Sequence, residues 1–137
     1  MPVQKKLSCS AKMDNLHTLL EYAGKFADQL GVDDEKRLQL ELALEEILVN
    51  IICYAYQPPP GEIELACDKK QDNSLEVTIV DAGIPFNPLG QNTPDINASL
   101  EERDAGGLGI FLATKMVDDI HYSRANDRNI VTMTKRI

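Results

Sequence analysis

The sequence predicts a two-layer α/β (α+β) sandwich, in which helices cover one face of a mixed β-sheet. A long run with helical periodicity occupies Asp33–Tyr56, and residues 62–67 and 75–80 alternate apolar with polar side chains as half-buried strands do. Around them the predicted elements follow the order β, α, α, β, β, long loop, α, β, β. With 137 residues, 43% of them hydrophobic, the chain can bury one sizeable core, so residues 1–137 are predicted to form a single domain.

The net charge, the lack of a long apolar run and the small number of cysteines and histidines exclude several classes of function. The net charge is −8, from 22 acidic and 14 basic residues, which argues against direct binding to nucleic acid or to an anionic membrane. No apolar run approaches the roughly 18 residues that span a bilayer, and the N-terminus lacks a signal-peptide core, so we expect a cytoplasmic protein. Cys9, Cys53 and Cys67 are predicted to be free thiols, and His17 and His121 structural or surface residues.

Two elements are predicted before the central helix. Residues 3–11 carry apolar side chains compatible with a first strand. A helix follows, which Asp14 or Asn15 can cap and Gly31 ends.

The central helix, Asp33–Tyr56, carries an apolar stripe that must face a core, and Asp33 is its predicted N-cap. Along one flank of the stripe lie Gln39, Glu46 and Asn50, and the last two project together because they are four residues apart. A carboxylate beside an amide can activate a hydroxyl or water while the amide oxygen helps to hold a hard cation. Taken alone, the pair also suits an ordinary amphipathic helix.

The second half of the chain begins with a hairpin of residues 62–67 and 75–80. From Asp81 to Ala105 the periodicity vanishes, and a loop this long is expected to act as a lid, at about residues 84–106. A short helix over residues 110–120 is predicted next. The chain then closes with two strands, 120–123 and 129–137.

Asp81-Ala82-Gly83 directly follows a predicted strand, so its carboxylate should point from the end of the sheet into the gap below the helices. A buried carboxylate can accept a hydrogen bond from an exocyclic amine such as that of adenine, and Gly83 would leave clearance for a flat ligand. A simple turn is the alternative interpretation of this motif.

Gly106-Gly107-Leu108-Gly109 opens the helix after the lid, where exposed backbone amides favour phosphate. The motif is neither a P-loop nor a dinucleotide-binding fingerprint, and a hinge at a helix start is the alternative. The basic pairs Lys5-Lys6 and Lys135-Arg136 are predicted to be solvated termini.

In this order the motifs resemble those of the GHKL (Bergerat-fold) ATPases, and within them the small bacterial anti-sigma-factor serine/threonine kinases. The resemblance covers nearly the whole chain and is carried by three segments, EEILVNIICYAY, VDAGIPFNP and GGLGIFLATKMVD. It implies a Bergerat ATP-binding fold that uses ATP and Mg²⁺.

The resemblance also implies roles for individual residues. Glu46 would be the general base for a substrate serine or threonine, and Asn50 would be a Mg²⁺ ligand. Asp81 would bind the adenine amine, with Gly83 giving clearance.

Around the phosphates, Gly107, Leu108 and Gly109 would lie against the nucleotide as the lid closes. Arg103 would be the cation that reaches the terminal phosphate. These residues and the lid would complete the site around ATP.

The chain departs from the family pattern at three places. Tyr54 stands where the family often has His. Asn129 or Thr132 would have to replace a threonine that helps to hold adenine, and no basic residue for partner docking occurs around Thr18.

The implied function is ATP-dependent phosphorylation of a STAS-type anti-anti-sigma protein, combined with sequestration of a sigma factor by a homodimer. Two alternatives keep the same fold. One is an ATP-loaded module that sequesters a partner without phosphorylating it, and the other is a detached catalytic domain of the histidine-kinase type.

Overall fold

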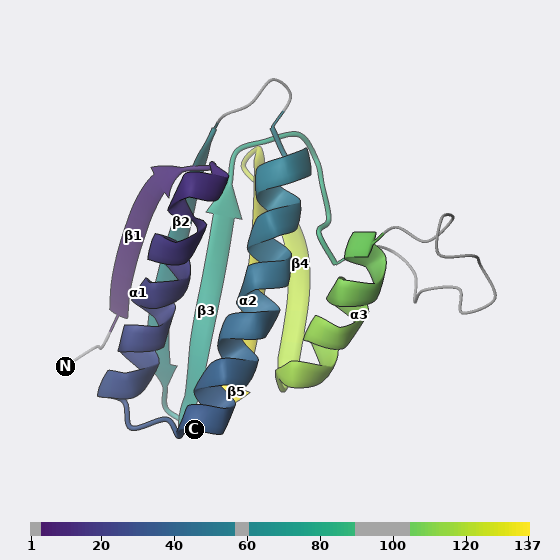
Figure 1. Cartoon of the computed structure of the whole chain (residues 1–137). Coiled ribbons are helices and arrows are strands. Elements are labelled where there is room, and N and C mark those ends of the chain that lie inside the picture. The colour runs from purple at the N-terminus through teal and green to yellow at the C-terminus, as the bar shows by residue number, and fades with distance from the viewer. Residues whose placement is uncertain (1–3, 57–60, 90–104) are drawn as a thin grey trace.

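A five-stranded sheet forms one layer, and three helices lie side by side on one of its faces (Figure 1). The computed structural model describes residues 4–56, 61–89 and 105–137. The elements are β1 (Gln4–Ser10), a 3₁₀ turn (Met13–Asn15), α1 (Leu16–Gln29), α2 (Asp34–Tyr54), β2 (Glu62–Lys70), β3 (Ser74–Asp81), α3 (Ala105–Met116), β4 (Asp119–Ala125) and β5 (Arg128–Arg136). This confirms the two-layer α+β fold and the predicted order of elements.

The sheet has the order β1-β2-β3-β5-β4, and each of its four pairings is antiparallel, so the prediction of a mixed sheet was wrong. The reason lies in the last crossover. The connection from β3 through α3 brings β4 back parallel to β3, but the β4–β5 hairpin places β5 between them. No two parallel strands are therefore neighbours among the described residues.

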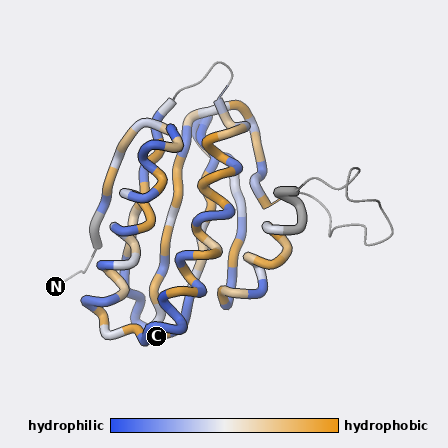
Figure 2. The backbone as a smooth tube through the Cα atoms, viewed as in Figure 1, coloured by the Kyte–Doolittle hydropathy of each residue, from blue (hydrophilic) through white to orange (hydrophobic). Residues whose placement is uncertain are grey.

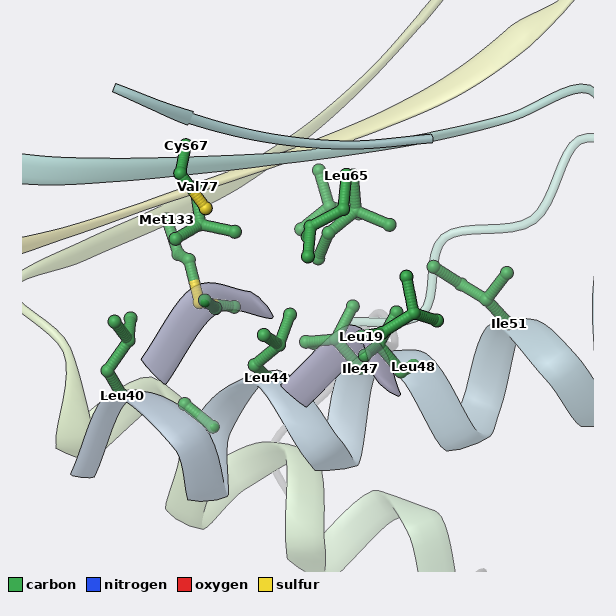
Figure 3. Close-up of a cluster of buried hydrophobic side chains, with 14 of the residues drawn as sticks. Leu19, Leu40, Leu44, Ile47, Leu48, Ile51, Leu65, Cys67, Val77 and Met133 are labelled. Carbon is green, nitrogen blue, oxygen red and sulfur yellow. The ribbon is translucent and has the colours of Figure 1, made fainter. Parts of the chain in front are cut away.

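The core lies between the sheet and the helices, and α2 supplies much of it. Figure 2 shows apolar positions recurring along the helices and alternating along the strands. In Figure 3 the side chains of both layers point toward one another; the labelled ones are Leu19, Leu40, Leu44, Ile47, Leu48, Ile51, Leu65, Cys67, Val77 and Met133. Asp33 caps α2 as predicted, since its side chain accepts a hydrogen bond from the Lys36 N–H at 2.8 Å.

The three cysteines are free, as predicted, but their surroundings differ. Cys67 is buried in the core, which raises the pKa of its thiol to about 12. Cys53 is exposed on α2, and Cys9 is partly buried, which raises the pKa of the Cys9 thiol. None of the helices in the described ranges combines the length and apolar content that crossing a bilayer requires.

The β4–β5 hairpin is longer than the sequence predicted. Asn126 and Asp127 form a two-residue turn with φ of 54° and 60°, which matches the type I′ turn that right-twisted strands favour. The strands therefore run on to Ala125 and begin again at Arg128, and Arg124 lies opposite Asn129. This register determines the site described below.

Lys135 was predicted to be a solvated terminal residue, which is wrong. Its side chain is half-buried and links the sheet to the helices, a contact called the Lys135 tie below. Its Nζ donates to Gln39 Oε1 on α2 and to the carbonyl of Met116 at the C-terminal end of α3, each at 2.7 Å. A cation at this end of a helix also complements the helix dipole. Gln39 therefore serves this contact, at a distance from the other two residues of its predicted flank.

Replacing Lys135 with methionine should lower the free energy of unfolding by about 1.5 to 3 kcal/mol, because two hydrogen bonds from a charged donor are lost. Urea denaturation measures the change. Arg136→Met is the matched control, since Arg136 is the next residue in the chain and its side chain is exposed. Equal effects of the two substitutions would show that the tie contributes nothing.

Candidate functional site

Three polar side chains form a row across one end of the sheet. Asp81 on β3 pairs with Asn129 on β5, and Asn129 pairs with Arg124 on β4. Asn129 is two positions from the buried Val131 on β5 and shares its face of the strand, so the row belongs to the face that the helices cover. The site is therefore built where β3 ends and the β4–β5 hairpin turns.

Asp81 is 2% exposed, and the two oxygens of its carboxylate differ in their hydrogen bonds. Oδ1 accepts from the Gly83 N–H at 2.9 Å and from Asn129 Nδ2 at 2.8 Å. Oδ2 is buried and has no hydrogen-bond partner; in the part of the chain that the structure describes, Arg37 Nε is the other such side-chain atom. Leaving a buried acceptor unpaired costs about 1 to 3 kcal/mol, and more for a charged group, so Oδ2 is suited to a donor from a ligand.

Asn129 is fully buried, and its amide is saturated by the protein. Its Oδ1 accepts from the Phe86 N–H at 3.1 Å, Tyr122 Oη–H at 2.6 Å and Arg124 Nη1 at 3.1 Å. Its Nδ2 donates to Asp81 Oδ1 and to the Ile84 carbonyl, both at 2.8 Å. No donor or acceptor of Asn129 is left for a ligand, so it acts on the site by fixing Asp81.

Thr132, the other residue offered for the family's threonine, is placed differently. It lies three positions along β5 from Asn129, and strand alternation puts it on the opposite face of the sheet. It therefore faces away from the Asp81 carboxylate.

The loop after Asp81 is held at nearly every residue. The Ala82 N–H donates to Tyr56 Oη at 2.8 Å, Arg124 Nη1 donates to the Gly83 carbonyl at 3.0 Å, and the Ile84 N–H donates to the Ala55 carbonyl at 2.8 Å. The loop is thus fixed to α2 on one side and to β4 on the other.

Gly83 has a packing role that the sequence did not reveal. A Cβ at this position would overlap the Ala55 carbonyl, which is backbone and cannot move aside easily. Glycine is therefore needed for the loop to approach the end of α2. Clearance for a flat ligand stays a prediction.

We expect Gly83→Ala to lower the free energy of unfolding by about 1 to 3 kcal/mol, as overpacking does. Urea denaturation provides the measurement. Gly24→Ala is the control, because its Cβ would meet only the flexible Glu41 carboxylate and alanine favours a helix. The packing role is refuted if Gly83→Ala is as well tolerated as Gly24→Ala.

Glu46 and Asn50 lie on the flank of α2 that faces α3. Asn50 is 7% exposed, and its Nδ2 donates to the Glu46 carbonyl at 2.7 Å, which leaves the side-chain oxygen as the group available to a ligand. The half-buried Glu46 carboxylate lies against Gly109, where a Cβ would overlap Oε2. The structure thus brings Glu46, Asn50 and Gly109 together, as the order of motifs predicted.

Helix α3 begins at Ala105, so Gly107, Leu108 and Gly109 lie inside its first turns rather than before it. Arg103 and most of the predicted lid fall in residues 90–104, outside the described residues. Their contacts with phosphate stay predictions.

Tyr54 lies at the end of α2 beside the Asp81 loop. Its ring centroid is 6.0 Å from that of Phe86, with the rings inclined by 50°. Tyr54 is 49% exposed, so one part of the ring packs on the loop while the rest stays accessible.

The described residues contain no group of three or more His, Cys, Asp or Glu side chains arranged to hold a metal ion. Mg²⁺ at nucleotide sites is usually held by one or two protein oxygens together with phosphates and water. The Asn50 side-chain oxygen, which the hydrogen bond from Nδ2 to the Glu46 carbonyl leaves free, is a donor of that kind.

A hollow of about 150 Å³ lies near the same end of the sheet. Asp81 borders it, and the other residues that line it are Ser8, Tyr56, Glu62, Ile63, Glu64, Val80, Ala82 and Arg128. Glu64 and Val80 pair across β2 and β3 one position away from Asp81, so they face the side opposite the helices. The two glutamates would repel phosphates, which argues against this hollow as a nucleotide site.

Tyr56, Tyr122 and Arg124 are site residues that sequence reasoning missed. Arg124 lies beyond the end of the predicted strand at Ser123, and Tyr122 lies within that strand but in no recognisable motif. The Asn126-Asp127 turn was the available signal, since a two-residue hairpin at that point places Arg124 opposite Asn129.

Known proteins resemble this chain over most of its length. A family model described as "Histidine kinase-like ATPase domain" matches residues 9–135. The serine-protein kinases RsbW of Bacillus mycoides (strain KBAB4) and Bacillus cereus (strain ATCC 10987 / NRS 248) are each 30% identical over 115 residues, which cover 81% of this chain and 71% of the relative.

Two solved structures share the fold. The first contains the RsbU and RsbW domains of Rv1364c from Mycobacterium tuberculosis, with a TM-score of 0.67, 16% identity, 97% coverage of this chain and 32% of that longer chain. The second is the histidine kinase domain of the blue-light activated histidine kinase EL346 from Erythrobacter litoralis, with a TM-score of 0.56, 17% identity and coverage of 85% and 60%. This chain therefore belongs to the histidine kinase-like (GHKL) ATPase family, in the branch of the anti-sigma-factor serine kinases.

Proposed function

We propose that this chain is an ATP-dependent serine/threonine protein kinase that controls transcription by partner switching. The observation that carries the proposal is the buried, unpartnered Oδ2 of Asp81, an acceptor held ready at the sheet end below the helices. Its surroundings suit the 6-amino group of adenine, which is a donor. Membership of the anti-sigma-factor kinase family supports the same assignment.

In this proposal the chain's own residues divide the work of binding ATP. Asp81 accepts from the adenine amine, and Asn129 keeps the carboxylate in place without touching the base. Asn50 offers its side-chain oxygen to Mg²⁺. When bound, Mg²⁺ would neutralise charge on the phosphates during transfer.

In the proposed chemical step, Glu46 is the general base. Its carboxylate takes the proton of the substrate hydroxyl as that oxygen attacks the γ-phosphorus. The bond from phosphorus to the bridging oxygen of ADP breaks, so the products are a phosphoserine or phosphothreonine, ADP and a protonated Glu46. Gly107, Leu108 and Gly109 would contact the phosphates, and Arg103 would reach the terminal phosphate.

The proposed partners follow from family membership. They are a sigma factor, which the chain sequesters, and a STAS-type anti-anti-sigma protein, which it phosphorylates. We propose that the chain does this in the cytoplasm, as a homodimer, and without contacting nucleic acid or membrane.

A phosphotransfer assay in source-cell extract tests the function. Purified protein and Mg-ATP should add phosphate to serine or threonine of a small soluble protein, identified by mass spectrometry. An acid-labile, base-stable product would indicate histidine instead. Nucleotide binding without any new phosphosite would favour a module that only sequesters its partner.

A further inference from the structure

We infer that Tyr122 and Arg124 of strand β4 are positioning residues for adenine recognition, acting through Asn129 on Asp81. The inference rests on the proposed nucleotide site and adds to it two residues of an edge strand. Neither side chain is bonded to Asp81 itself; each is bonded to the amide that holds it.

The first step is the orientation of the Asn129 amide. A backbone N–H and a guanidinium can only donate, and those of Phe86 and Arg124 both point at the same atom of Asn129. That atom must be the oxygen, so the Tyr122 hydroxyl donates to it as well, at 2.6 Å. The NH₂ group is thereby turned toward Asp81.

The second step is the orientation of the carboxylate. Asn129 Nδ2 and the Gly83 N–H both donate to Oδ1, at 2.8 and 2.9 Å. Rotating the carboxylate would break both bonds, so Oδ2 stays the free acceptor. Oδ2 can then accept a hydrogen bond from the amine of a 6-amino purine. It would repel the carbonyl oxygen of a 6-oxo purine, because both atoms are acceptors.

Arg124 contributes a second constraint on the same loop. The Nη1 that reaches Asn129 also donates to the Gly83 carbonyl at 3.0 Å. The loop that supplies the other donor to Asp81 is thus held by the same guanidinium. Strand β4 therefore fixes both groups that orient the carboxylate.

Nucleotide selectivity separates positioning from simple support of the fold. The wild-type chain and Tyr122→Phe are titrated with Mg-ADP and with the Mg complex of purine riboside diphosphate, which lacks the 6-amino group. Tyr122→Phe should weaken ADP binding about 3- to 10-fold, the range for one lost hydrogen bond, and leave the analogue within about twofold. The ratio of the two affinities should therefore fall.

Tyr22→Phe is the matched control, since its hydroxyl donates to the Lys6 carbonyl at 3.0 Å, on the far side of the molecule from β4. It should change neither affinity. Arg124→Gln provides a second variant and should reduce the same ratio. In an Asp81→Asn background, Tyr122→Phe should have no further effect on selectivity.

Three results would overturn the inference. Equal losses for ADP and the analogue would make Tyr122 and Arg124 merely structural, and unchanged affinities would exclude any role for them. A wild-type chain that binds ADP no better than the analogue would refute adenine recognition by Asp81, and with it the proposed nucleotide site.

Discussion

Replacing Glu46 with glutamine is expected to slow phosphotransfer by about 10²- to 10⁴-fold, the usual contribution of a general base. Glutamine has nearly the same shape as glutamate, so it can still pack against Gly109, but it cannot take the proton of the attacking hydroxyl. The affinity for Mg-ADP should stay within about threefold, because this change removes no proposed contact to the adenine ring. Initial rates with the substrate identified in extract measure the effect.

Glu45→Gln is the matched control for this prediction. Glu45 is the adjacent residue on α2 and is half-buried like Glu46, but Glu46 is the one whose carboxylate lies against Gly109. Glu45→Gln should leave the rate of phosphotransfer within about twofold of the wild-type rate. Wild-type phosphotransfer by Glu46→Gln would exclude Glu46 as the base.

Asp81→Asn is expected to weaken Mg-ADP binding by about 10- to 150-fold, the range for a hydrogen bond to a charged group. The asparagine amide must either turn its NH₂ toward the Asn129 donor or present it where the base amine would donate. Both arrangements oppose two donors. Calorimetric titration gives the affinity, and urea denaturation shows whether the variant is folded.

Asp119→Asn serves as the control for Asp81→Asn, because Asp119 is an exposed carboxylate at the start of β4. It should bind Mg-ADP as the wild type does. If Asp81→Asn kept wild-type affinity, adenine would have to be recognised elsewhere.

Local patterns in the sequence were sufficient for the main elements. The apolar stripe and the Asp33 cap predicted α2, since both depend on residues close together in the chain. The same helical spacing placed Glu46 and Asn50 on one flank. The strand before Asp81 also predicted that its carboxylate would leave the end of the sheet toward the helices.

The features that the sequence did not predict depend on contacts between segments that are distant in the chain. The packing of Gly83 depends on the Ala55 carbonyl, and the Lys135 tie needs α2, α3 and β5 in their final positions. The antiparallel sheet follows from where the last hairpin inserts, which periodicity does not determine.

Asn129 illustrates how a departure from a family pattern can mislead. The sequence suggested a residue that replaces a threonine contact to adenine. In the structure its five hydrogen bonds are all to the protein, so its effect on a ligand must pass through Asp81. A direct contact could be excluded only once Tyr122 and Arg124 were placed on β4.

The most direct test of the nucleotide site is one calorimetric comparison of Mg-ADP with Mg-GDP on the wild-type chain. Mg-ADP should bind with micromolar affinity and Mg-GDP at least about tenfold more weakly, because the 6-oxo group of guanine would oppose Asp81 Oδ2. Equal affinities, or no binding of either nucleotide, would contradict the proposed nucleotide site.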